Sequence, residues 1–147
     1  MSDKLQTLAN TLELHSVSYE ISPSEPVTTW LKDNFPIADW GRVLWSSIDS
    51  ARCESYTDLA HASQIINRLI LNEGLGNPSV IILFSNAISP AIEIGLDTFT
   101  HFAPEIITQD FDLWICCKED SWCLEIYHEN EICWGRTKIW NQRTQSP

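Results

Sequence analysis

The stretch from residue 112 to residue 135, DLWICCKEDSWCLEIYHENEICWG, constrains the fold more than any other part of the chain. Polar residues 118–121 separate two runs rich in β-forming residues, a pattern that predicts a β-hairpin. Pairing Cys117 with Trp122 sorts these runs into an apolar face and a mixed face. The apolar face holds Leu113, Ile115, Cys117, Trp122, Leu124 and Ile126, and the mixed face holds Asp112, Trp114, Cys116, Cys123, Glu125 and Tyr127. A shift of one residue would mix the two sets, so the sequence predicts this register.

We expect the apolar face to pack in the core and the mixed face to lie in water. Solvent-facing strands usually carry Thr, Lys, Glu and Ser, whereas Trp and Tyr are enriched at binding interfaces. The mixed face therefore predicts a binding surface, unless a helix, for instance the first one, covers it and makes it core. If it is exposed, replacing Glu125 with alanine changes stability by less than about 0.5 kcal/mol.

A third strand is predicted after a turn within residues 128–131, which completes a C-terminal three-stranded meander. A two-residue turn at positions 129 and 130 sets the facing of this strand. It places Ile132, Trp134, Arg136 and Lys138 on the outward face, and Cys133 and Ile139 on the inward face. Residues 141–147 are polar and predict a tail.

Four of the five cysteines lie in the same stretch, but their spacing does not fit a zinc site. Structural zinc sites use two closely spaced ligand pairs, commonly C-x₂₋₄-C. Cys116 and Cys117 are adjacent, and adjacent residues of a strand point to opposite faces. We expect the cysteines to act as small apolar side chains, with no metal and no cofactor. Because a cytoplasm keeps thiols reduced, all five are predicted to be free.

The rest of the chain alternates helical and extended patterns. Helices are predicted at residues 3–14, from 26 to about 35, from a cap at Thr57 to about 72, and from 89 towards Pro104; strands are predicted at 16–21, 41–48 and 79–85. The predicted class is α+β, with helices packed on a mixed or antiparallel sheet. A length of 147 residues fits a single domain over 1–147.

The charge of the chain is acidic and unevenly distributed. It carries 20 acidic and 9 basic residues, a net charge of −11. Residues 86–133 alone carry 10 acidic residues and one basic residue, Lys118, a net charge of −9. Such a surface repels nucleic acid and anionic membranes and attracts a basic protein. With no apolar run near the ~20 residues of a membrane helix and no signal-peptide pattern, we expect a cytoplasmic protein.

Catalytic motifs are absent from the sequence. His128 begins HENEI, which is not the H-E-x-x-H zinc motif, and neither a P-loop nor G-x-S-x-G occurs. Asp110 and Asp112 flank Phe111 and could bind Mg²⁺, although DFD in front of a strand is more typical of a polar strand entry. We predict that the protein is not an enzyme and has no small-molecule substrate.

An acidic α+β domain of this kind resembles the immunity proteins of bacterial contact-dependent growth inhibition and related polymorphic-toxin systems. The likeness rests on residues 110–134, DFDLWICCKEDSWCLEIYHENEICW, as a meander rich in acids and tryptophan, and on the size and charge of the whole chain. It involves no signature motif. The resemblance implies a protein encoded beside a toxin gene, which binds the C-terminal domain of that toxin, often a nuclease. Because nucleases carry basic clefts, an acidic surface would complement them.

The predicted toxin-binding residues combine carboxylates and aromatic anchors of the meander. They are Trp114, Glu119, Asp120, Glu125, Tyr127, Glu129, Glu131 and Trp134. The alternative is a secretion chaperone of the type III class, which is also small, acidic and α+β, or an adaptor without catalytic activity. Those chaperones usually end in a helix and dimerise, whereas this chain is predicted to end in a strand and a polar tail.

Overall fold

The computed structural model describes residues 3–86 and 89–137. The helices are α1 (Asp3–Leu14), α2 (Glu25–Asn34), α3 (Leu59–Asn72), α4 (Leu96–His101) and α5 (Ala103–Ile107), with a 3₁₀ turn η1 (Trp45–Ser47). The strands are β1 (Glu20–Ser22), β2 (Arg52–Ser55), β3 (Ser79–Phe84), β4 (Ala91–Gly95), β5 (Leu113–Cys117), β6 (Trp122–Tyr127) and β7 (Glu131–Arg136). The expectations for Lys138, Ile139 and the tail at 141–147 lie outside the described residues. No described helix is long and apolar enough to cross a membrane.

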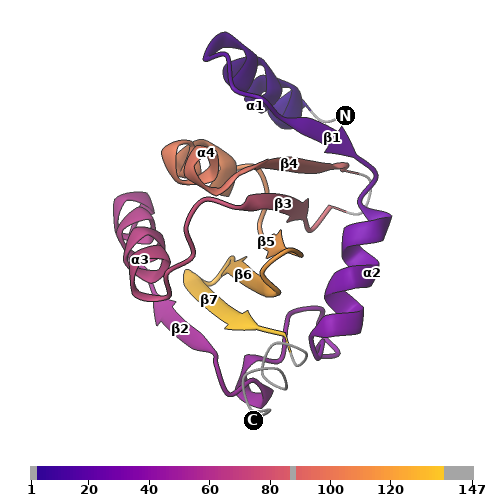
Figure 1. The fold of residues 1–147 in the computed structure, drawn as a ribbon, viewed down its shortest axis with the longest axis vertical. Coiled ribbons are helices and arrows are strands. Elements are labelled where there is room, and N and C mark those ends of the chain that lie inside the picture. The colour runs from indigo at the N-terminus through magenta and orange to yellow at the C-terminus, as the bar shows by residue number, and fades with distance from the viewer. Residues whose placement is uncertain (1–2, 87–88, 138–147) are drawn as a thin grey trace.

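The seven strands form one sheet in the order β1-β4-β3-β5-β6-β7-β2 (Figure 1). Every neighbouring pair is antiparallel. Strands β5, β6 and β7 lie side by side as a meander, which confirms the predicted class and the predicted C-terminal arrangement. The edge strand β2 belongs to the first half of the chain but pairs with β7. This edge of the sheet therefore forms only when segments far apart in the sequence come together.

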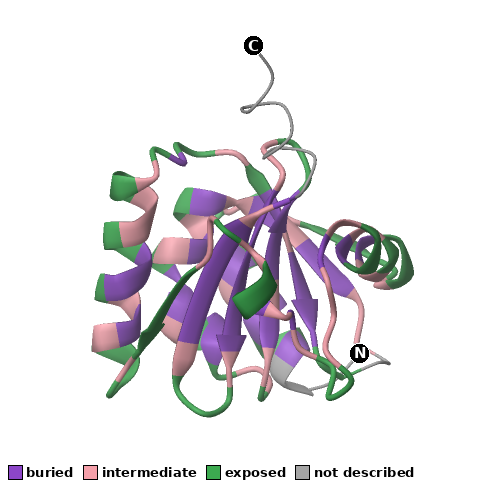
Figure 2. Cartoon of the chain, turned by 90° about the horizontal axis from the view of Figure 1, so that it is seen from below, coloured by how far each residue is buried: buried purple, intermediate pink, exposed green. Residues whose placement is uncertain are grey.

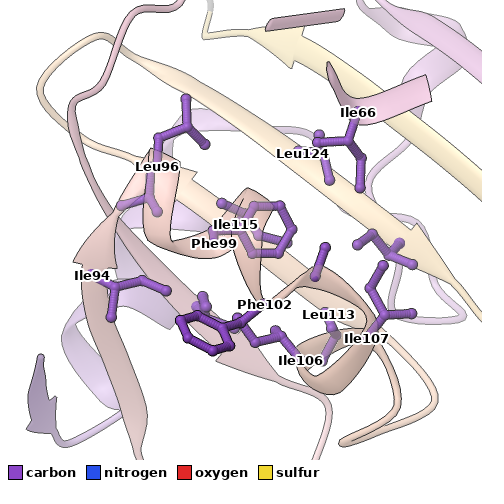
Figure 3. Close-up of a cluster of buried hydrophobic side chains, with 14 of the residues drawn as sticks. Ile66, Ile94, Leu96, Phe99, Phe102, Ile106, Ile107, Leu113, Ile115 and Leu124 are labelled. Carbon is purple, nitrogen blue, oxygen red and sulfur yellow. The ribbon is translucent and has the colours of Figure 1, made fainter. Parts of the chain in front are cut away.

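The larger core lies between one face of the sheet and helices α3, α4 and α5, with apolar residues of α1 joining it. Figure 1 shows α3 and α4 on this side of the sheet and α2 on the other. In Figure 2 the central strands are almost entirely buried. Side chains from α3, β4, α4, α5, β5 and β6 converge in Figure 3 around Phe99, which has no exposed surface.

The opposite face of the sheet is also buried. Helix α2 contributes Val27 and Leu31 to a second core, and the segment after it adds Phe35, Val43 and Trp45. These residues cover the face of the meander that carries Cys116, Cys123 and Cys133. The alternative that a helix covers the mixed face is therefore correct, although the helix is α2 and not the first one. The expectation of a solvent-facing meander is wrong.

The predicted helices at 3–14 and 57–72 are confirmed as α1 and α3, and the strand at 79–85 as β3. The cap of α3 is Asp58, not Thr57, because its carboxylate accepts the backbone N–H of His61 at 2.8 Å. The predicted strand at 16–21 is reduced to β1.

Two predicted elements are wrong. Residues 41–48 do not form a strand: Val43 makes an isolated bridge with Ile37, and the chain then turns into η1. The helix expected from Ser89 is instead the strand β4 followed by α4, because Ile92 and Ile94 alternate with Glu93 at the period of a strand.

The register of the first hairpin is confirmed at every predicted pair, from Leu113 opposite Ile126 to Cys117 opposite Trp122. The facing of β7 is wrong, because three residues, 128–130, join β6 to β7. Asn130 adopts a left-handed φ of 62°, as expected at the end of a three-residue hairpin loop. One extra turn residue moves every side chain of β7 to the other face.

Replacing Leu124 with alanine is expected to lower the free energy of unfolding by about 2–5 kcal/mol, since its side chain is 2% exposed and the change leaves a cavity. Chemical denaturation measures this loss. The control is Leu71→Ala on α3, where the side chain is 80% exposed and the expected change is below about 0.5 kcal/mol. Equal losses at the two positions would contradict the packing of β6.

Candidate partner-binding surface

The carboxylate of Glu125 is buried, with 1% of its surface exposed, so the prediction that it lies on an open binding face is wrong. Its Oε1 accepts hydrogen bonds from Arg42 Nε at 2.8 Å and from the indole of Trp45 at 3.0 Å. Its Oε2 accepts the backbone N–H of Val43 and the indole N–H of Trp114, each at 2.9 Å. With these four hydrogen bonds, the Glu125 carboxylate holds residues 42–45 against the sheet. Because both of its oxygen atoms are already occupied by donors, it cannot act as a general base.

Arg42 links Glu125 to the surface. Its Nη2 lies 2.7 Å from Glu131, whose side chain is 35% exposed, and its guanidinium lies 4.0 Å from the centre of the Tyr127 ring. Burial disfavours the charge of Arg42, but hydrogen bonds to Glu131 and the charge of Glu125 outweigh burial and raise the pKa of the guanidinium. Arg42 is therefore a fixed cation that neutralises part of the local negative charge.

Trp134 is 1% exposed and lies opposite Leu124 in the larger core, so its predicted position on an outward face is wrong. The three-residue turn described above is the cause. Trp114 is half-buried, and it borders an open pocket of about 380 Å³ together with Leu31 and Leu83. Neither tryptophan protrudes as an anchor.

The remaining predicted residues do not form a single patch. Glu119 and Asp120 lie in the turn between β5 and β6, whereas Tyr127, Glu129 and Glu131 lie at the turn between β6 and β7. The six residues of β6 separate the two turns by roughly 17–20 Å, at about 3.3 Å per residue. Glu119 and Glu129 are exposed, and Asp120, Tyr127 and Glu131 are intermediate.

Two aromatic residues outside the predicted binding set, Phe111 and His128, lie beside the predicted residue Tyr127 at the β6–β7 turn. Phe111 is 80% exposed, and its ring meets the edge of the His128 ring at a centroid distance of 6.4 Å. His128 stacks on Tyr127 at 4.3 Å. The sequence signal for this cluster is the DFD tripeptide, whose pattern is typical of a polar strand entry and could also bind Mg²⁺.

The prediction of five free thiols is wrong, because Cys53 and Cys133 form a disulfide. Cys53 lies directly opposite Cys133 in the β2–β7 pair, with Cα atoms 4.1 Å apart. Sequence analysis missed this neighbour because it did not identify β2. Glu131 lies within 4.8 Å of the two sulfur atoms, but they are bonded to each other and Arg42 already pairs with the carboxylate, so we assign the group a structural role.

The other three cysteines are free and buried. Cys116 and Cys123 face each other with their sulfur atoms 4.0 Å apart, while Cys117 lies on the opposite face, as predicted from strand geometry. Burial raises the pKa of Cys117 to about 11, and burial together with Cys116 raises the pKa of Cys123. The thiols of Cys117 and Cys123 are therefore protonated at neutral pH, and burial shields all three free cysteines from reagents.

A family model described as CdiI immunity protein EcoliA0-like matches residues 9–135. The chain belongs to the CdiI immunity protein family. This match confirms the resemblance to contact-dependent growth inhibition immunity proteins. A CdiI protein has a cognate toxin as its partner, and the family gives this chain a toxin-neutralising role. No curated protein sequence matches the chain. The match covers the whole sheet except part of β7, together with the second core and the β6–β7 turn.

Proposed function

We propose that this CdiI-family protein neutralises a toxin domain that is a basic nuclease, by covering a cationic surface of the toxin with carboxylates and aromatic side chains. The observation that carries the proposal is the family match together with the net charge of −9 over residues 86–133. Nucleases hold phosphates with lysine and arginine, so an acidic inhibitor competes with the nucleic acid for the same groups. The protein acts in the cytoplasm by binding, without catalysis.

Fewer of the predicted toxin-binding residues are accessible than the sequence predicted. Glu125 and Trp134 are buried and support the fold, and Trp114 borders a pocket. The accessible candidates are Glu119, Asp120, Tyr127, Glu129 and Glu131. Because these lie at two ends of β6, each end needs a separate test.

Protection of cells is the primary test. The C-terminal domain encoded by the neighbouring toxin gene is expressed with and without this protein. We expect growth to be restored against this domain and not against unrelated toxin domains. Failure to protect against the neighbouring toxin would overturn the proposed function.

The contribution of charge to binding is tested by measuring the rate at which this protein associates with the toxin domain. The association rate should fall strongly between low salt and ~0.5 M salt, where the Debye length is only a few Å. At low salt, Glu129→Lys and the double change Glu119→Lys with Asp120→Lys each reverse charge at one end of β6. The change at the end that faces the toxin is expected to slow association about tenfold or more.

The matched control is Glu20→Lys on the edge strand β1, an exposed carboxylate at the far side of the sheet. Its association rate should stay within about twofold of the unchanged protein. An association rate that does not respond to salt would contradict binding by charge complementarity, while leaving the protective role intact.

A further inference from the structure

The most exposed aromatic side chain of the described residues sits on an unusually well-fixed loop. Phe111 is 80% exposed, and Asp110 precedes it. Asp110 Oδ1 accepts the backbone N–H of Phe111 at 2.7 Å, and its Oδ2 accepts the backbone N–H of Asn86 at 2.8 Å. The loop is thereby tied to the end of β3.

Asp112 fixes the other side of Phe111. Its Oδ1 lies 2.9 Å from the backbone N–H of His128 and 2.9 Å from the ring Nδ1 of the same residue. Both oxygens of Asp110 and one oxygen of Asp112 are thus engaged with nitrogen atoms of the protein. The two aspartates of DFD fix the backbone on either side of Phe111, which reduces the backbone entropy that binding costs.

Phe111 ends a row of flat groups, here called the aromatic ladder: Arg42, Tyr127, His128 and Phe111, with the Phe111 and His128 rings nearly perpendicular. The guanidinium lies 4.0 Å from the Tyr127 ring centre, and the next two centroid distances are 4.3 Å and 6.4 Å. Arg42 in turn is held by the buried carboxylate of Glu125. The ladder therefore runs from the buried carboxylate of Glu125 to an exposed phenyl ring through successive contacts.

The charge around the ladder is negative. Carboxylates at Asp110, Asp112, Glu129 and Glu131 surround it, and the charge of Arg42 is matched by Glu125 and Glu131. Aromatic faces attract guanidinium and ammonium groups, and neighbouring carboxylates add charge-assisted hydrogen bonds to the same cations. Large aromatic side chains at the centre of an interface are common hot spots, and neighbouring carboxylates select a cationic partner.

We infer that Phe111 and the aromatic ladder form the centre of the interface with the toxin, and that they receive arginine or lysine side chains of the toxin's cationic surface. This inference rests on the proposed function and names the surface through which it operates. Phe111 contributes buried area and a π face, while the exposed Glu129 pairs with cations at the rim. The turn at 118–121 lies outside this interface.

The test compares two exposed apolar side chains that differ in position. Binding of the C-terminal domain encoded by the neighbouring toxin gene is measured by calorimetry for Phe111→Ala and for Leu71→Ala. Both side chains are 80% exposed, but Leu71 lies near the end of α3, away from the ladder. Phe111→Ala should weaken binding about 30-fold or more, and Leu71→Ala should leave it within about twofold. Both variants should keep the thermal midpoint of the unchanged protein.

Two further measurements separate this inference from the proposed function. Phe111→Trp keeps a π face and should retain binding within about fivefold. Hydrogen exchange of the complex should show protection at residues 108–112 and 127–131. If the unchanged protein binds and protects but Phe111→Ala binds within threefold of it, the ladder is not the interface and the inference is wrong. If the unchanged protein does not bind, the proposed function itself fails.

Discussion

Replacing Glu125 with alanine is expected to lower the free energy of unfolding by about 3–5 kcal/mol, among the largest effects of any single substitution in this protein. The carboxylate is 1% exposed and accepts four hydrogen bonds. Its removal leaves the guanidinium of Arg42 without its buried partner, and the indoles of Trp45 and Trp114 without acceptors. Each buried donor without a partner costs about 1–3 kcal/mol, and more when the donor is charged.

Denaturant unfolding measures the effect, with Glu129→Ala as the control. Glu129 lies in an exposed turn, so its removal should change stability by less than about 0.5 kcal/mol. Glu125→Gln keeps the shape and one acceptor oxygen, so its loss should fall between these values. A loss at Glu125 no larger than that at Glu129 would show that the network carries no net stability. That result would agree with the sequence-based expectation that Glu125 lies on the surface.

The first hairpin was predictable because its information is local. Apolar and mixed residues alternate on both sides of a polar turn, and only one register keeps the two sets apart. All five predicted pairs from Leu113–Ile126 to Cys117–Trp122 occur. The third strand was not predictable to the same degree, because its facing depends on whether the turn has two or three residues. The pattern of β7 does not decide this, since Ile132, Cys133 and Trp134 are all apolar.

The burial of Glu125 was not predictable, since it depends on residues 80 to 83 positions away in the sequence. Arg42, Val43 and Trp45 reach the sheet because α2 and the turn after it fold over β6. The alternating sequence pattern around Glu125 is the same whether its carboxylate is hydrated at the surface or paired with a buried arginine. The sequence supplied the class of protein through charge and composition, but the exposed candidate Phe111 emerged only from contacts with His128 and Asp112.

The Cys53–Cys133 disulfide is expected to contribute about 2–5 kcal/mol to stability, a prediction that reverses the expectation of free thiols. The two cysteines are 80 positions apart, and a cross-link that closes a long loop removes much of the conformational freedom of the unfolded chain. It also fastens the short edge strand β2 to β7, next to Glu131 and Arg42. Without the disulfide, the edge strand β2 should therefore be the first to detach from the sheet.

Cys53→Ser tests this prediction, because the Cys53 position is exposed and the new hydroxyl costs little in itself. Unfolded under non-reducing conditions, the unchanged protein should titrate three thiols, those of Cys116, Cys117 and Cys123. Without reductant, Cys53→Ser should be less stable than the unchanged protein by about 2–5 kcal/mol; with reductant, the two should agree within about 1 kcal/mol.

In the folded state the three free thiols should react slowly with alkylating reagents, because they are buried and the pKa values of Cys117 and Cys123 are raised. Titration of five thiols would show that Cys53 and Cys133 are not bonded, and then reductant should change the stability of neither protein.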